Sequence, residues 1–194
     1  VDNIEKAGTI GKAGYGWEVK IVDSSGAPVP KGQVGELIVK GPGVMVCYYR
    51  DPKATADVLK DGWLYTGDMA QEDEDGFIML VDRKKDVIIS GGENLYPGQI
   101  ENFLRTYEPV YDVAVIGLPD KRLGEIAAAV ISVKQGFSCT EEDINQFCKK
   151  LPRYKRPHKI IFADVPRNPT GKIEKPKLRT LYGSSRLVEA QNRA

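Results

Sequence analysis

A charged stretch at residues 82–86 (DRKKD) separates two parts of the chain that follow different patterns of apolar and polar residues. Upstream of it, short segments of alternating apolar residues are separated by turns rich in glycine and serine, which is typical of antiparallel strands. Downstream of it, strand-like segments alternate with segments of helical periodicity. We therefore expect an α+β protein. Residues 1–84 form a small β subdomain, residues 85–182 an α+β domain with a central, mainly antiparallel sheet flanked by helices, and residues 183–194 a tail.

Local signals predict where the elements lie. Asp51 before Pro52 predicts a helix start, because aspartate caps a helix and proline suits its first turn. Thr140 with Asp143 at the third position predicts another capped helix. The expected strands are residues 17–21, 35–39, 63–69, 77–81, 87–90, 113–116, 126–133 and 159–163, and the expected helices are residues 51–59, 97–107, 140–151 and 175–182.

Composition and charge exclude several functional classes. The 28 basic and 27 acidic side chains leave a net charge of +1, which gives no reason to expect a nucleic-acid or anionic-membrane partner. Cys47, Cys139 and Cys148 form no CxxC pair, which argues against a zinc cluster and fits a reducing cytoplasm. His158 is the only histidine, so we expect no metal site in this chain. No apolar run is long enough for a transmembrane segment.

Asp68, in the sequence YTGD, is the first candidate for binding chemistry. A carboxylate at the end of a strand can accept one proton from each hydroxyl of a ribose. The alternative is a turn aspartate that bonds to its own backbone. Arg83 lies at the end of the next expected strand, and a hairpin can bring it back toward Asp68. The pair would then offer an acceptor and a donor to one nucleotide.

Two further stretches allow more than one interpretation. The adjacent Gly91 and Gly92 indicate either a tight turn or a narrow passage where a ligand lies against bare backbone. A basic run lies between residues 149 and 159, and it is either a solvated face or a site for phosphates. Its members are Lys149, Lys150, Arg153, Lys155, Arg156 and Lys159.

Lys172 follows Gly171 in the sequence NPTGKI, which invites comparison with a phosphate-binding P-loop. That loop requires a first glycine five residues before the second, and a serine or threonine after the lysine. Pro166 and Ile173 occupy those two positions. Lys172 therefore needs another explanation.

Four motifs in order resemble the C-terminal motifs of the adenylate-forming superfamily. They are YTGD at 65–68, DRKKD at 82–86, SGGEN at 90–94 with YP at 96–97 and IE at 100–101, and PRNPTGKI at 166–173. GEL at 35–37 with GPGVM at 41–45 and YY at 48–49 resembles an earlier motif. The resemblance is nearest to fatty-acid or aryl-acid CoA ligases, and it covers nearly everything from residue 8 to 182.

The resemblance implies a two-step reaction. A small carboxylic acid and Mg-ATP give an acyl-adenylate and pyrophosphate, and the thiol of coenzyme A then takes the acyl group and releases AMP. By the resemblance, Asp68 and Arg83 bind the nucleotide, and Lys85 is the hinge of a mobile C-terminal domain. Lys172 is the catalytic residue of the first step. Gly91, Gly92 and the adjacent Glu93 line the pantetheine passage of the second.

Some features depart from the family pattern. Ile89 stands where aryl-acid ligases often carry lysine, and Gln99 where glutamate is common. The family's phosphate loop and acyl pocket are missing, so we expect residues 1–84 to be the last subdomain of a larger N-terminal domain whose other parts are missing. We also expect little activity of the chain alone. Two alternatives stay open at this stage: an adenylation domain that loads a carrier protein, and a non-catalytic adaptor module that binds a nucleotide.

Overall fold

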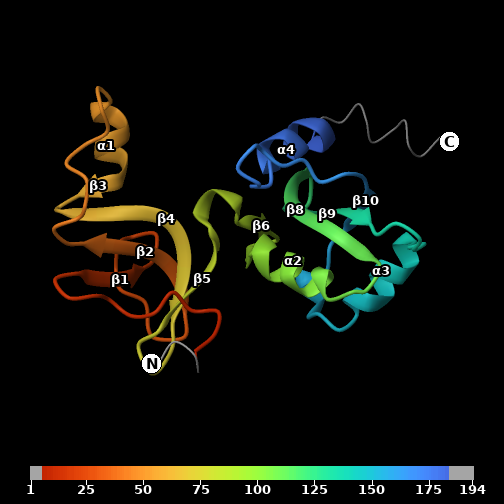
Figure 1. Cartoon of the computed structure of the whole chain (residues 1–194), viewed down its shortest axis with the longest axis horizontal. Helices are drawn as coiled ribbons and strands as arrows, with labels where there is room; N and C mark the ends of the chain where they lie inside the picture. The colour runs from red at the N-terminus through yellow and green to blue at the C-terminus, as the bar shows by residue number, and fades with distance from the viewer. Residues whose placement is uncertain (1–5, 184–194) are drawn as a thin grey trace. The chain divides into compact units, whose positions relative to one another are not determined.

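The computed structural model describes residues 6–183. It divides into two compact units, of which the first ends at Lys85 and the second begins at Asp86. Figure 1 traces both units in chain order, and each is described by itself below. No helix within the described residues is long and apolar enough to cross a membrane.

The first unit is built around one five-stranded antiparallel sheet. Strand β4 is central: β2 pairs along one of its edges, while β3 and β5 pair with the other, and β1 extends the sheet beyond β2. Its small core contains Ile21, Leu37, Ala70 and Ile78. The elements are β1 (Glu18–Val22), β2 (Val34–Lys40), α1 (Pro52–Val58), β3 (Leu59–Lys60), β4 (Trp63–Glu72) and β5 (Ile78–Arg83).

The second unit contains a mixed sheet covered by helices. Its strand order is β10-β9-β6-β7, with β8 also paired to β9, and only the β9–β10 pair is parallel. The short turn η1 (Lys84–Asp86) crosses the boundary between the units. The elements are β6 (Ile88–Ser90), β7 (Glu93–Leu95), α2 (Pro97–Arg105), β8 (Val110–Asp120), β9 (Gly124–Val133), α3 (Glu141–Cys148), η2 (Arg153–Lys155), β10 (Lys159–Phe162) and α4 (Lys175–Gly183).

Strand β8 is buried on both faces because helices cover both sides of the sheet (Figure 1). Side chains alternate between the faces of a strand. Val113 and Val115 accordingly join a core with α2 and α3, while Ala114 and Ile116 join a core with α4. The segment that contains Lys172 leads directly into α4, so this packing anchors it to the sheet.

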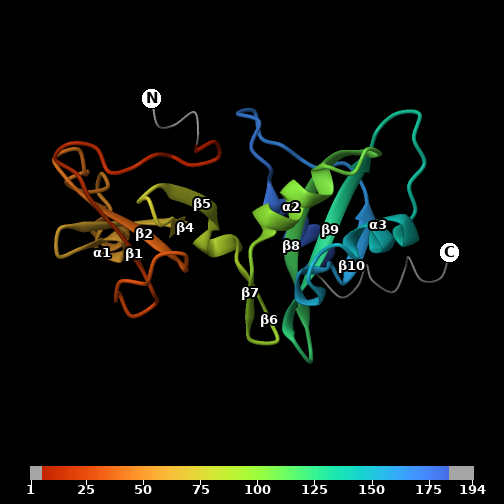
Figure 2. The same cartoon turned by 90° about the horizontal axis from the view of Figure 1, so that it is seen from below.

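The predicted fold class is confirmed, and the structure corrects several elements. Strands β3 and β7 and the turn η2 were not predicted, and β8 is much longer than residues 113–116. β7 arises because the chain turns back at residues 91–92 and pairs with β6, as Figure 2 shows. A three-residue strand is too short for a periodicity to be recognised. The identities assigned to the two domains stay predictions, and the tail after Gly183 lies outside the described residues.

Candidate functional site

Asp68 and Arg83 face each other across the β4–β5 pair. They are register partners, and Arg83 Nε lies 3.0 Å from Asp68 Oδ1. Asp68 does not end its strand as expected, because β4 continues to Glu72. Instead, residues 66–68 lie opposite Leu37 alone in an irregularity of the β2–β4 pairing. Such bulges redirect side chains and are frequent beside functional sites.

The contacts of Asp68 leave its carboxylate available for a ligand. Its backbone N–H donates to the Thr66 hydroxyl at 3.1 Å. Arg83 engages Oδ1, and the Asp68 side chain is 28% exposed. A half-buried carboxylate beside a guanidinium suits ribose hydroxyls and a phosphate, because it supplies acceptors and donors at one place.

Glu36 supports this region, although sequence reasoning singled it out only as part of a motif. Its side chain is buried on β2 and accepts hydrogen bonds from the Gly67 N–H at 3.2 Å and the Lys84 ammonium at 2.6 Å. One carboxylate therefore holds both the bulge before Asp68 and the residue before Lys85. Only the tertiary pairing of β2 with β4 reveals this function of Glu36.

Lys85, the predicted hinge, lies between two anchored neighbours. Lys84 is paired with Glu36 inside the first unit, and Asp86 accepts a bond of 2.7 Å from Arg179 inside the second. Lys85 itself is exposed, and its side chain has no hydrogen bond or ion pair within residues 6–183. Within the described part of the chain, Lys85 is therefore a residue without a side-chain hydrogen bond or ion pair of its own, between two neighbours whose side chains are each paired within one unit.

Gly91 and Gly92 form the tight turn of the β6–β7 hairpin. Ser90 pairs with Glu93 across the turn, and the two glycines have φ angles of +58° and +87°. Positive values at both central positions define a type I′ turn, which favours glycine. A Cβ atom added at Gly92 would have nothing within 4 Å. Gly92 is therefore needed for its backbone angle and not for lack of space within the fold.

Lys172 lies on a loop whose backbone is held from within. Its N–H donates to Asn168 Oδ1 at 2.9 Å, and its carbonyl accepts from the Asn168 N–H at 2.9 Å. Gly171, at φ +83°, allows the tight turn before it. The Lys172 side chain is exposed, and its ammonium has no bonding partner in the described part of the chain. The loop thus presents a free cation on a fixed backbone.

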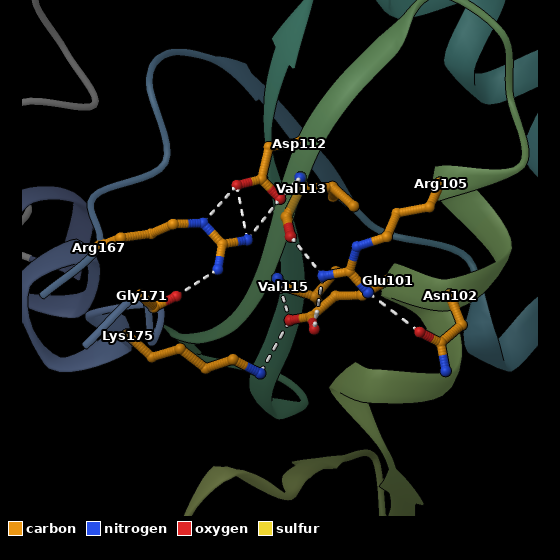
Figure 3. Close-up of polar contacts among 9 residues, drawn as sticks. All are labelled: Glu101, Asn102, Arg105, Asp112, Val113, Val115, Arg167, Gly171 and Lys175. Atoms are coloured by element: carbon orange, nitrogen blue, oxygen red, sulfur yellow. Dashed lines mark hydrogen bonds and ion pairs between the residues drawn. The ribbon is translucent and has the colours of Figure 1, made fainter. Parts of the chain in front are cut away.

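Ion pairs fix this loop to the rest of the second unit on both sides of Lys172 (Figure 3). Before it, Arg167 forms an ion pair with Asp112 of β8 at 2.8 Å. After it, Lys175 lies 2.8 Å from Glu101 of α2, and both side chains are largely buried. Glu101 also accepts the buried N–H of Val115 at 2.8 Å. In the sequence Glu101 stands out only as a motif residue, and nothing there indicates its partner Lys175, 74 positions away.

The basic run at residues 149–159 is largely occupied by contacts inside the second unit. Arg156 donates to the carbonyls of Leu151 and Lys149, and Lys155 donates to Gln99. These contacts favour a structural interpretation of the run over a phosphate site. Gln99, one of the departures from the resembled pattern, thereby has a structural partner. No cluster of three or more metal-ligating side chains occurs among residues 6–183.

Two protein-family models match the chain. The family model for the C-terminal domain of AMP-binding enzymes matches residues 99–172, which contain Lys172 and the Arg167–Asp112 ion pair before it. The model for AMP-binding enzymes matches residues 1–49. The chain belongs to the AMP-binding enzyme family.

Named members of the AMP-binding enzyme family are similar over most of the chain. It is 43% identical to the feruloyl-CoA synthase of Amycolatopsis sp over 181 residues, which are 92% of the chain and 37% of that protein. It is 42% identical to a long-chain-fatty-acid–CoA ligase of Mycobacterium tuberculosis over 186 residues, which are 95% of the chain and 37% of that protein. The chain thus spans 37% of the length of these relatives.

Solved structures of AMP-binding enzymes share the fold. The structure of ATP-bound MatB from Rhodopseudomonas palustris superimposes with a TM-score of 0.86 at 35% identity, over 91% of this chain and 36% of that one. The predicted site residues fall into two groups. Asp68, Arg83 and Lys85 belong to the first unit, and the Gly91–Gly92 turn and Lys172 belong to the second.

Proposed function

We propose that the chain supplies the C-terminal part of an ATP-dependent acyl-CoA synthetase. In the first step a carboxylate oxygen attacks the α-phosphorus of ATP, and the bond to pyrophosphate breaks. In the second step the thiol of coenzyme A attacks the acyl carbon, loses its proton and releases AMP. Support comes from family membership and from relatives that are named as a CoA synthase and a CoA ligase.

The observation that carries the proposal is the free ammonium of Lys172 on a rigid loop. During adenylate formation, negative charge develops on the oxygens of the carboxylate and the α-phosphate. A cation that needs no rearrangement stabilises this charge more in the transition state than in the ground state. Because no partner within the described residues engages the ammonium, no ion pair has to break before it acts.

Asp68 and Arg83 supply the proposed nucleotide contacts. Asp68 would accept the ribose hydroxyl protons, with Arg83 fixing the carboxylate and offering its remaining N–H groups to the nucleotide. The magnesium ion would arrive with the ATP phosphates, which supply its oxygen ligands. Neither ATP nor magnesium requires a preformed metal site in this chain.

The hairpin turn at Gly91, Gly92 and Glu93 is the proposed passage for the pantetheine arm of coenzyme A. Nothing lies within 4 Å of a Cβ placed at Gly92, so the turn leaves free space beside the backbone. Lys85 is the proposed hinge that alternates the second unit between the two steps, since both its neighbours are anchored and it is not. Three free cysteines fit a reducing, cytoplasmic location.

The test compares Lys172→Ala with the unchanged enzyme in the two half-reactions. Candidate acids include ferulate and a long-chain fatty acid, because relatives are named for both. We expect pyrophosphate release to slow by about 10²–10³, while supplied acyl-adenylate is converted to acyl-CoA at nearly the normal rate. Lys177→Ala is the matched control, since it removes an exposed lysine paired with Glu174 at 3.9 Å. Equal losses of rate in both half-reactions would contradict the role of Lys172. If the enzyme without substitutions formed no acyl-CoA from any acid, the proposed function would be contradicted.

A further inference from the structure

Arg167 uses all three nitrogens of its guanidinium to connect the Lys172 loop with strand β8 (Figure 3). Nε donates to Asp112 Oδ2 at 2.9 Å, and Nη2 donates to Oδ1 at 3.0 Å. Nη1 donates to the carbonyl of Gly171 at 2.6 Å. A planar fork of fixed donors is suited to such a contact, because it sets direction as well as distance.

Strand β8 is shaped to present Asp112 to this arginine. The β8–β9 register shifts between Val110 and Asp112, so Tyr111 is an extra residue in the ladder. A bulge of this kind bends the strand and redirects the next side chain. Asp112 also accepts its neighbour's backbone N–H, from Val113, at 2.9 Å. Its side chain is 13% exposed, whereas that of Arg167 is 43% exposed.

The contact with Gly171 lies one residue before Lys172. Asn168 bonds to both backbone groups of Lys172 and thereby shapes the loop, but it belongs to the same loop. Arg167 instead joins the carbonyl before Lys172 to a strand more than fifty residues away in sequence. The internal bonds therefore fix the form of the loop, and the Arg167 fork ties the carbonyl next to Lys172 directly to the sheet.

We propose that Arg167 is a positioning residue for Lys172 and that Asp112 is its anchor. This role rests on the proposed function, because it assumes that Lys172 acts in adenylate formation. The Arg167 side chain is 43% exposed, which reduces the net contribution of the fork to folding. Its contribution to rate is larger, because a displacement of about 1 Å at a reacting group can slow a reaction by about 100-fold. The buried pair of Lys175 with Glu101 holds the chain after Lys172, and replacing Arg167 leaves that pair in place.

The main experiment is a double-mutant cycle in adenylate formation, measured by pyrophosphate release. We expect Arg167→Ala to slow this step by about 10- to 100-fold and to leave the conversion of supplied acyl-adenylate unchanged. Arg167→Lys should recover part of the loss, since a lysine can pair with Asp112 but lacks the fork. In the Lys172→Ala enzyme, Arg167→Ala should cause no further loss, because a residue that acts only through Lys172 has nothing left to position. The proposal would be overturned if Arg167→Ala slowed pyrophosphate release by the same factor with Lys172 present and with Lys172→Ala. It would also be overturned if Arg167→Ala slowed both half-reactions equally.

A second measurement does not depend on catalysis. Hydrogen exchange of the peptide that covers residues 168–173 reports how firmly the loop is held. We expect exchange to accelerate by about tenfold or more in Arg167→Ala and in Asp112→Asn, and to stay unchanged in the Lys177→Ala control. Unchanged exchange in the first two variants would overturn the proposal even in an active enzyme. Faster exchange in a protein that forms no acyl-adenylate would refute the proposed function while leaving the loop anchor in place.

Discussion

Replacing Glu101 tests how much the buried ion cluster of Glu101 and Lys175 contributes to the stability of the second unit. Glu101 is 6% exposed, and its carboxylate binds the Lys175 ammonium and the Val115 N–H, both at 2.8 Å. Arg105 lies farther away, at 3.6 Å, and is more exposed. Glu101→Ala leaves one buried cation and one buried N–H without a partner.

The magnitude follows from which groups are left unpaired. Removing one partner of a buried ion pair costs about 3–5 kcal/mol of unfolding free energy. Glu101→Gln keeps an oxygen for the Val115 N–H and the Lys175 ammonium but loses the charge. We expect that variant to lose about 1–3 kcal/mol, the scale of a hydrogen bond to a charged group. Lys177→Ala, which breaks an exposed pair at 3.9 Å, should stay within about 0.5 kcal/mol of the unchanged chain.

Urea unfolding with two signals can locate the effect. Both tryptophans, Trp17 and Trp63, lie in the first unit, so tryptophan fluorescence follows that unit. Hydrogen exchange of the β8 amides follows the second. We expect the alanine variant to lower the stability of β8 and to leave the fluorescence midpoint unchanged. Losses below about 0.5 kcal/mol in both Glu101 variants would refute a buried, charged cluster at this position.

Three further predictions concern single residues. Asp68→Ala should weaken AMP binding in the intact enzyme by about 1.5–3 kcal/mol, and unchanged affinity in calorimetry would remove Asp68 from the nucleotide site. Gly92→Asn should fold, because asparagine tolerates positive φ and a Cβ has space there. The variant should slow thioester formation from supplied acyl-adenylate but not pyrophosphate release. Normal rates of both steps would contradict the pantetheine passage. Burial raises the pKa of the Cys148 thiol to about 11. A maleimide at pH 8 should therefore label the exposed Cys47 first. Mass spectrometry should find Cys148 labelled only when the pH is raised or the second unit unfolds.

Elements whose signals lie within a few residues were predictable. Helix α1 begins where Asp51 and Pro52 indicate, and the Asp51 side chain accepts the Ala54 N–H. Helix α3 begins with the capping box of Thr140 and Asp143. Strand β9 lies within two residues of its predicted range. Capping bonds and turn angles depend on neighbours in the chain, so the order of amino acids suffices to indicate them.

The sequence by itself determined the α+β class, the family resemblance and the residue types that the proposed chemistry needs. Only the tertiary structure decided which of those residues meet. The pairing of β2 with β4 brings Glu36 to Gly67, and the packing of both α2 and α4 on β8 brings Lys175 to Glu101. The bulge at Tyr111 presents Asp112 to Arg167. Such contacts depend on which strands are neighbours and in which register, because one residue of slip turns a side chain to the opposite face of the sheet.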